Sequence, residues 1–443
     1  MRIKISEHFT IKKILRLILP SSAMMVFISV YGMVDGIFVS NFVGETPFAA
    51  VNLTWPMIMI FGGVGFMFGT GGNAIISRTI GEGKKELANK YFSLIVYATI
   101  ITGILLSIIA LIFNRRLCML LGATGDLLQN CVTYCKVIFP CIPFFMLQNV
   151  FQSLTATAEK PKLSLVATIA AGISNVVLDA LFILVFKLGL FGAALGTAST
   201  QVLGGLIPLV YFSKHNNSLL RLGKPEIDFH ILAHTCTNGM SELISNITLS
   251  LVSILYNLEI LKIAGQLGVN AYGIVMYVSF IFIAIYIGYT IGVAPVVGYN
   301  YGAQNIDELQ NVFKKSLIIT AFMGLAATLS SEGLARPFAM IFAAGDEALI
   351  NMTVHGFRIF ALAFLLGGFS MFASSFFTAL GNGPVSAAIA FLRTFMFQIL
   401  PLYILPRFLG LDGIWASMVV AEVLGIAVSA AFLIGKRRRY NYY

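Results

Sequence analysis

Charged side chains are scarce in this chain. Asp, Glu, Lys and Arg make up 11% of its 443 residues, whereas a soluble globular domain carries about 25%. Hydrophobic residues make up 58%, and the acidic residues number only 19. A composition so far from the even mix of a soluble domain is typical of a membrane protein.

Features that would mark an enzyme or an ATP-driven pump are also missing. The glycine-rich stretch Gly62–Gly72 lacks the Gly-Lys-Ser/Thr of a phosphate-binding loop and lies within an apolar run. His230 and His234 stand one helical turn apart without a third metal ligand. We find no supported nucleophile–base constellation. We therefore expect no enzyme activity, no cofactor and no metal ion other than Na+.

Cysteine is rare as well. The five cysteines include no Cys-x-x-Cys motif, and four of them cluster near the start of one apolar segment: Cys118, Cys131, Cys135 and Cys141. One interpretation is a disulfide among these residues, but we favour the interpretation that they are free thiols on apolar helix faces.

The first apolar run, from Ile14, is too long for a signal peptide and no small-residue cleavage site follows it, so we expect it to be retained.

Long apolar runs dominate what is present. A window of about 19 residues separates twelve of them, and they are twice as long as the strand of a membrane barrel. We therefore predict an all-α polytopic membrane protein with twelve spans, near residues 14–38, 48–70, 88–113, 131–155, 163–186, 191–213, 232–256, 272–296, 312–333, 355–379, 385–407 and 413–435.

The basic residues are distributed unevenly about these spans. Of the 29 Lys and Arg, twenty fall on the side that holds both termini, eight fall on the opposite side, and Arg393 alone falls within a span. This is the positive-inside pattern, so both termini should be cytoplasmic. The net charge of +10 therefore reflects topology and contact with anionic lipid rather than binding of nucleic acid.

The two halves of the chain resemble each other. The run Gly71–Gly81 maps onto Gly292–Gly302 at an offset of 221 residues, and Gly44 maps onto Gly265. Six spans separate equivalent points, so both halves run the same way through the membrane. Such a repeat predicts two six-helix bundles around a central cavity. We place the N-terminal lobe at 1–212, a polar cytoplasmic linker at 213–229 and the C-terminal lobe at 230–443.

Polar side chains gather at one depth in the first half. Asn175 and Asp179 lie one turn apart on one helix face, and Asp35 and Thr197 lie at a depth similar to that of Asp179, roughly 10–14 Å from the outer surface at 1.5 Å per residue. An acid inside a span is costly and usually marks an ion, proton or substrate path. These four residues could share a proton or hold Na+, while a purely structural hydrogen bond between Asn175 and Asp179 is the alternative.

The second half lacks this set. Its equivalents of Asp35, Asn175, Asp179 and Thr197 are Tyr256, Gln398, Leu402 and Met418. Two other acids approach mid-membrane there, and with two aromatic residues they are our candidates for lining a substrate cavity: Glu242, Glu422, Tyr277 and Phe280. For Glu242, packing beside Ser245 and Asn246 is an equal alternative, and either aromatic ring could instead face lipid or the core.

An ordered set of short motifs runs through the first half of the chain: Pro20, 34–39 (Val-Asp-Gly-Ile-Phe-Val), Ala49-Ala50, 76–81 (Ile-Ser-Arg-Thr-Ile-Gly), 175–179 (Asn-Val-Val-Leu-Asp) and 192–197 (Gly-Ala-Ala-Leu-Gly-Thr). On these residues the chain resembles the multidrug and toxic compound extrusion (MATE) family of cation-coupled exporters, and the resemblance covers essentially its whole length. The resemblance implies a V-shaped two-lobe fold. It also implies a first-lobe cation or proton site at Asp35, Asn175, Asp179 and Thr197. The acid that some members carry in the tenth span is absent between His355 and Ala379.

We therefore expect a secondary antiporter of the bacterial inner membrane. It would act as a monomer and export small organic cations or amphipathic drugs against H+ or Na+. A lipid-linked saccharide flippase of the same broad superfamily is the first alternative, although its pyrophosphate cargo would favour a more basic cavity. A receptor-like membrane protein that transports nothing is the second alternative.

Overall fold

The computed structural model describes residues 3–343 and 346–443, and these residues form helices and connecting turns without strands. Arg2, one of the twenty basic residues counted above, lies outside the described residues. The first half contains α1 (Ile11–Phe42), α2 (Glu45–Gly81), α3 (Lys85–Leu120), α4 (Gly125–Ile138), the 3-10 turn η1 (Phe139–Cys141), α5 (Ile142–Thr157), α6 (Pro161–Asp179), the π-helical segment η2 (Ala180–Val185) and α7 (Gly189–Ser213).

The second half repeats this arrangement. It contains α8 (Phe229–Gly302), α9 (Ile306–Phe342), α10 (Glu347–Ala379), α11 (Gly383–Phe391), the π-helical segment η3 (Leu392–Met396), α12 (Phe397–Ile404), α13 (Pro406–Leu409) and α14 (Leu411–Tyr440). Residues 214–228, between α7 and α8, have no helix or strand. They are held on α3, where the backbone amides of Arg221 and Gly223 donate to Asn89 and Ser93.

Eleven helical stretches of the described residues are long and apolar enough to cross a membrane. One of them, α8, has 74 residues and is broken at Gly265, where φ is +61°. Glycine tolerates this left-handed backbone because it has no Cβ. The break divides α8 into two stretches that are each long enough to cross a membrane, so the described residues contain twelve such stretches, the number that the hydropathy predicted. Gly44, its counterpart in the repeat, also has a positive φ, +119°, just before α2.

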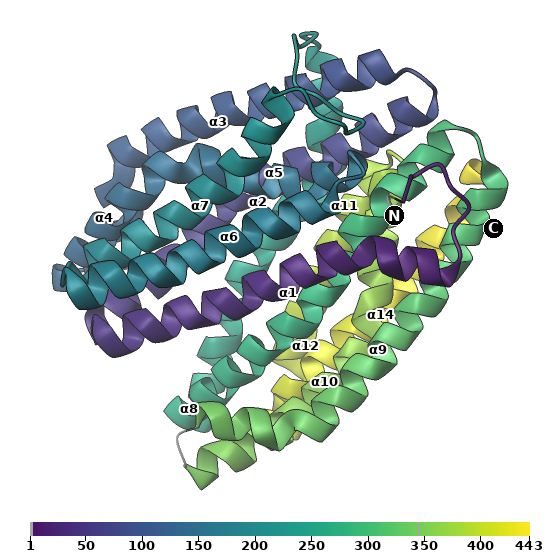
Figure 1. The fold of residues 1–443 in the computed structure, drawn as a ribbon. Helices are drawn as coiled ribbons and strands as arrows, with labels where there is room; N and C mark the ends of the chain where they lie inside the picture. Colours follow the sequence, from purple (N-terminus) through teal and green to yellow (C-terminus); the bar gives the residue numbers. More distant parts are fainter. Residues whose placement is uncertain (1–2, 344–345) are drawn as a thin grey trace.

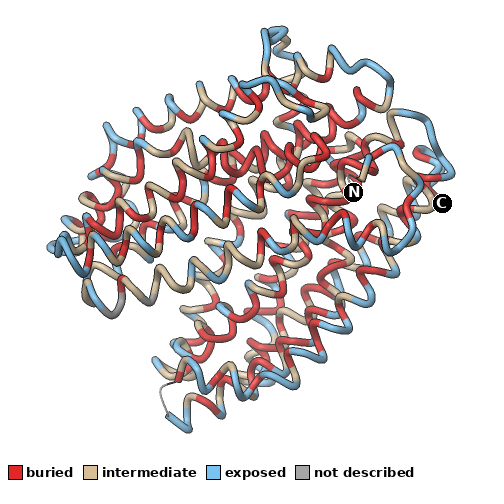
Figure 2. The backbone as a smooth tube through the Cα atoms, viewed as in Figure 1, coloured by how far each residue is buried: buried red, intermediate tan, exposed pale blue. Residues whose placement is uncertain are grey.

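The outer faces of the helices are apolar, as a lipid environment requires. Along α3, exposed apolar side chains recur at helical spacing on one face, where Ile112 is 71% exposed; this face also includes Ile101, Ile104, Leu105, Ile108 and Ile109. Figure 2 shows the buried residues concentrated inside the two bundles and the exposed ones on their outer surfaces. All five cysteines are free thiols, which confirms the favoured reading.

The two halves form two bundles that diverge from one end of the molecule, so the ribbon has the shape of a V (Figure 1). Both chain termini lie at the end where the bundles meet, which we call the terminal end. There α2 and α8 touch backbone to backbone. A Cβ at Gly81 would overlap the carbonyl oxygen of Tyr299, and a Cβ at Gly302 would overlap that of Arg78. These reciprocal contacts follow from the repeat, since Gly302 is the equivalent of Gly81, and Tyr299 of Arg78, at the offset of 221 residues.

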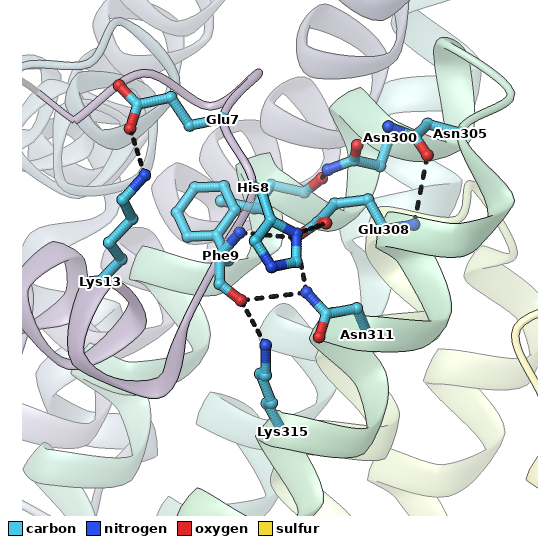
Figure 3. Close-up of polar contacts among 10 residues, drawn as sticks. Glu7, His8, Phe9, Lys13, Asn300, Asn305, Glu308, Asn311 and Lys315 are labelled. Carbon is cyan, nitrogen blue, oxygen red and sulfur yellow. Dashed lines mark hydrogen bonds and ion pairs between the residues drawn. The ribbon is translucent and has the colours of Figure 1, made fainter.

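An N-terminal strap, residues 3–9, crosses between the two bundles at the terminal end. The amide of Ile5 donates to Glu159, in the turn between α5 and α6, at 3.0 Å. The amide of Phe9 donates to Glu308, in the first turn of α9, at 2.8 Å, and His8 Nδ1 lies 2.6 Å from the other oxygen of that carboxylate (Figure 3). Ile5 and Phe9 are buried. The strap therefore ties the first lobe to the second.

Candidate functional site

The first-lobe candidates lie on three helices that pack together. Asp35 lies in α1, Asn175 and Asp179 lie in α6, and Thr197 lies in α7. Helix α6 packs against both α1 and α7, which brings the polar faces of all three inside the lobe. Asn175 and Asp179 are 2% and 0% exposed, so their polar groups are withdrawn from solvent and must find partners within the protein or in a bound ion.

The carboxyl of Asp35 faces the side chains of Asp179 and Asn175. Four of the oxygens here are buried without a hydrogen-bond partner among the described residues: Asp35 Oδ1, Asn175 Oδ1, Asp179 Oδ1 and Asp179 Oδ2. Two ionised carboxylates offer no proton to each other, and buried acceptors left unpaired are costly. A shared proton or a monovalent cation would satisfy these oxygens, so the arrangement fits either ion.

Local backbone features leave room for Asp179. A Cβ at Gly196 would overlap Asp179 Oδ1 and would lie 3.4 Å from Asn175 Nδ2, so only glycine lets α7 pass this close. Asp179 is the last residue of α6, and the π-helical segment η2 begins directly after it. Such π-turns shift the direction of the side chains around them and are frequent at functional sites.

Two tyrosines also lie beside the acid pair, and the sequence analysis missed both. Tyr134 of α4 is buried, and its hydroxyl lies near Thr197 and within range of the charges of Asp35 and Asp179. This hydroxyl has no hydrogen-bond partner among the described residues. Tyr31 of α1 faces Asp35 and Gln148. Tyr31 precedes Asp35 by one turn, so the helical spacing alone could have found it. Nothing in the sequence pointed to Tyr134, because its place depends on how α4 packs against α7.

The two second-lobe acids have different surroundings. Glu242, in the first half of α8, is half-buried, and no described residue makes a side-chain hydrogen bond or ion pair with its carboxylate. Its neighbours Leu243 and Asn246 contact Gly63 of α2, so it lies close to the seam between the lobes. Glu422 of α14 is buried and forms a two-pronged ion pair with Arg393, which the sequence analysis did not foresee.

The aromatic candidates lie on exposed parts of α8. Tyr277 is 41% exposed and stacks on Phe342 at the end of α9. Phe280 is 38% exposed, and its carbonyl oxygen accepts a hydrogen bond from Ser29 of α1, so it lies at the seam between α1 and α8. Of the two, Phe280 is the one that lies beside the other lobe.

A V of two membrane-crossing bundles with unpartnered acids inside one of them defines a multi-pass membrane transporter. The MatE family model matches residues 20–181 and 243–404, two stretches that begin 223 residues apart, as the internal repeat requires. The chain belongs to the MatE family.

Curated relatives and solved structures agree with this assignment. The chain is 26% identical over 409 residues to the multidrug export protein MepA of Staphylococcus aureus, covering 91% of this chain and 89% of the relative. It is 27% identical over 411 residues, with the same coverage, to MepA of Staphylococcus saprophyticus. These relatives are transporters rather than enzymes.

Among solved structures, a MATE protein in complex with MaL6 has a TM-score of 0.91 at 24% identity, with 97% of both chains covered. An outward-facing MATE transporter of the MOP superfamily has a TM-score of 0.90 at 24% identity, covering 97% of this chain and 96% of that one. These structures confirm the two-lobe fold that the sequence predicted.

Proposed function

We propose that this protein is a secondary active antiporter that exports organic cations or amphipathic drugs in exchange for H+ or Na+. The observation that carries the proposal is the pair of facing carboxyls, Asp35 and Asp179, whose buried oxygens have no partner among the described residues. Two acids held this close in a low dielectric disfavour double ionisation, so they readily accept one positive charge.

The neutral oxygens around the pair support a monovalent ion. Asn175, Thr197 and Tyr134 carry oxygens without adding negative charge. A proton would need only the two acids, whereas Na+ would use these additional ligands. Both ions remain candidates for the coupling ion, and we propose no other cofactor.

The substrate would bind between the lobes. Glu242 is an acid without a basic partner close to the seam, and it would attract a cationic group. The relatives are multidrug export proteins, which supports small organic substrates. The alternative cargo, a lipid-linked saccharide, would favour an unpaired buried cation. Arg393, a largely buried cation of the second lobe, is already paired with Glu422.

We propose that the protein lies as a monomer in the bacterial cytoplasmic membrane with its terminal end in the cytoplasm. The sequence assigns twenty basic residues to the side of the membrane that holds the termini and eight to the other side, which supports this orientation. In that orientation the N-terminal strap and the contacts of Gly81 and Gly302 close the cytoplasmic side, and the open end of the V faces outward.

The test is substrate flux in proteoliposomes with the proton and sodium gradients imposed separately. Asp35→Asn and Asp179→Asn should each abolish gradient-driven export while the purified protein keeps its thermal stability. Asp126→Asn, at an exposed acid in the first turn of α4, is the control and should export at the normal rate. Unchanged export in both site variants would refute the proposed site. Absence of any substrate-dependent ion flux would favour a receptor-like protein.

A further inference from the structure

The second lobe contains an ion pair, largely withdrawn from solvent, between the π-helical segment η3 and α14. Arg393 Nε donates to Glu422 Oε2 at 2.9 Å, and Arg393 Nη2 donates to Glu422 Oε1 at 2.7 Å. The Arg393 side chain is 16% exposed and that of Glu422 2%. Arg393 lies eleven residues before the end of α12 and Glu422 eleven residues after the start of α14. Both are therefore about 16 Å from the outer helix ends, near the bilayer midplane.

The surrounding helices are shaped to hold this pair. A Cβ at Gly367 of α10 would lie 3.3 Å from Glu422 Cδ, and a Cβ at Gly425 of α14 would lie 3.4 Å from Arg393 Cγ, so two glycines leave the space that the pair fills. Arg393 lies within the π-helical segment η3, which widens the helix at this position. The titratable groups that face Glu422 from α8 are the hydroxyls of Tyr256 and Tyr286.

These hydroxyls are already satisfied. That of Tyr256 pairs with Ser417 at 2.7 Å, and that of Tyr286 donates to the carbonyl oxygen of Phe364 at 2.8 Å. Among the described residues, Arg393 is thus the charged group that meets the Glu422 carboxylate. The first lobe is the opposite case, because its two acids face each other with no basic side chain between them.

A guanidinium held in this way occupies the position at the carboxylate where a proton or Na+ would otherwise bind. Its two parallel N–H groups meet both carboxylate oxygens, which are the atoms that a proton or Na+ would use. Arginine cannot release its proton under physiological conditions, so the charge it supplies is permanent. A lysine or histidine at this position could lose its charge, whereas this pair stays neutral as a unit.

We propose that Arg393 is a built-in cation that permanently occupies the acidic site of the second lobe, so that Glu422 binds no coupling ion and coupling runs through the first lobe alone. Removal of the guanidinium should then turn Glu422 into a new site for a proton or Na+. The statement about coupling rests on the proposed antiport function, but the statement about Glu422 does not.

The test isolates the second lobe by using Asp35→Asn/Asp179→Asn as the background. The melting temperature of the purified protein is measured with Na+ replaced by N-methylglucamine at constant ionic strength, and again at low and high pH. Adding Arg393→Met should make the protein more stable with rising Na+ or falling pH, and the gain should saturate as a binding site fills. The background itself and the matched neutral variant Arg393→Met/Glu422→Gln should not share this gain.

Two outcomes would overturn the proposal. One is a folded Arg393→Met protein that responds to Na+ and pH like the neutral variant, because Glu422 would then accept no ion. The other is a melting temperature of the Asp35→Asn/Asp179→Asn background that rises and saturates with Na+ or protons, if this rise is lost when Arg393→Met/Glu422→Gln is added. Glu422 would then bind an ion even though Arg393 is present. The second comparison holds even if Arg393→Met alone fails to fold.

A transport measurement separates this proposal from the proposed function. With the first-lobe acids intact, Arg393→Met/Glu422→Gln should move the same number of ions per substrate as the unaltered protein, and a smaller number would contradict the proposal. If the first-lobe acids prove unnecessary for export, the proposed function fails. The melting comparison still decides whether Arg393 blocks Glu422, because that readout involves no transport.

Discussion

Gly196 of α7 lies directly against the carboxylate of Asp179 in α6, and a methyl group added at Gly196 would overlap Oδ1 of that carboxylate. The close approach of these two helices is what encloses the acid. Asp179 can therefore face Asp35 only as long as position 196 carries no side chain.

Gly196→Ala should reduce gradient-driven export by about tenfold or more. The added methyl must displace Asp179 or α7, and overpacking of this kind costs about 1–3 kcal/mol, where ~1.4 kcal/mol corresponds to a factor of ten. The measurement is initial export rate in proteoliposomes. Gly333→Ala in α9 is the control, since a Cβ there meets no atom within 4 Å. Equal rates for the two variants would show that the close approach is unimportant.

Tyr134→Phe should weaken binding of the coupling ion by about tenfold. The change removes a buried hydroxyl that lies near Thr197 and the acid pair and has no hydrogen-bond partner among the described residues. A bond from this hydroxyl to the charged site when the ion is bound would contribute about 1.5–3 kcal/mol. Ion affinity is read from the concentration of H+ or Na+ that gives half-maximal export. Tyr256→Phe in the second lobe is the control, because it removes a hydroxyl that is hydrogen-bonded to Ser417. A shift of the same size in the control would argue against a specific role for Tyr134.

Glu242→Gln should reduce the affinity for cationic substrates by about tenfold and leave that for neutral substrates unchanged. The substitution keeps the size of the side chain and removes an unpaired negative charge close to the seam between the lobes. Binding is measured with a matched pair of substrates that differ only in charge. Glu259→Gln, on the same helix and paired with Lys262, should change neither affinity. Equal losses for both substrates would instead indicate a structural or coupling role for Glu242.

Glu308→Gln should loosen the N-terminal strap. The Glu308 carboxylate accepts from the Phe9 amide and contacts His8 and Asn311, so loss of its charge should cost about 1–3 kcal/mol locally. Hydrogen exchange at the amides of Ile5 and Phe9 should accelerate by about tenfold or more. Glu45→Gln, at an exposed acid in the first turn of α2, is the control. Unchanged exchange in Glu308→Gln would mean that the strap is held by its apolar side chains.

The sequence was a good guide to the helices and a poorer guide to their ends. The predicted span 88–113 lies inside α3, which runs from Lys85 to Leu120, because hydropathy registers only the part of a helix that lipid surrounds. The repeat paired Gly44 with Gly265, and the structure has a left-handed backbone at the second of them, where it breaks α8. The polytopic fold class and the two lobes were therefore predictable from local composition and periodicity.

The candidate site was predictable only in part. Counting depth along each helix brought Asp35 and Asp179 to one level, and in the structure their carboxyls face each other. Depth does not specify the direction in which a helix is rotated, so it could not find Tyr134 on α4. For the same reason it placed Glu422 at mid-membrane without finding that Arg393, on a neighbouring helix, reaches it.

The sequence by itself determined that this chain is a multi-pass helical membrane protein built as a repeat, since apolar length and residue spacing are properties of the chain. It also located acids at depths where they must have partners. Only the tertiary structure decided what those partners are, because pairing depends on helix rotation and close approach. Packing leaves Asp35 and Asp179 facing each other with no basic side chain of the described residues paired with them, and it gives Glu422 the guanidinium of Arg393.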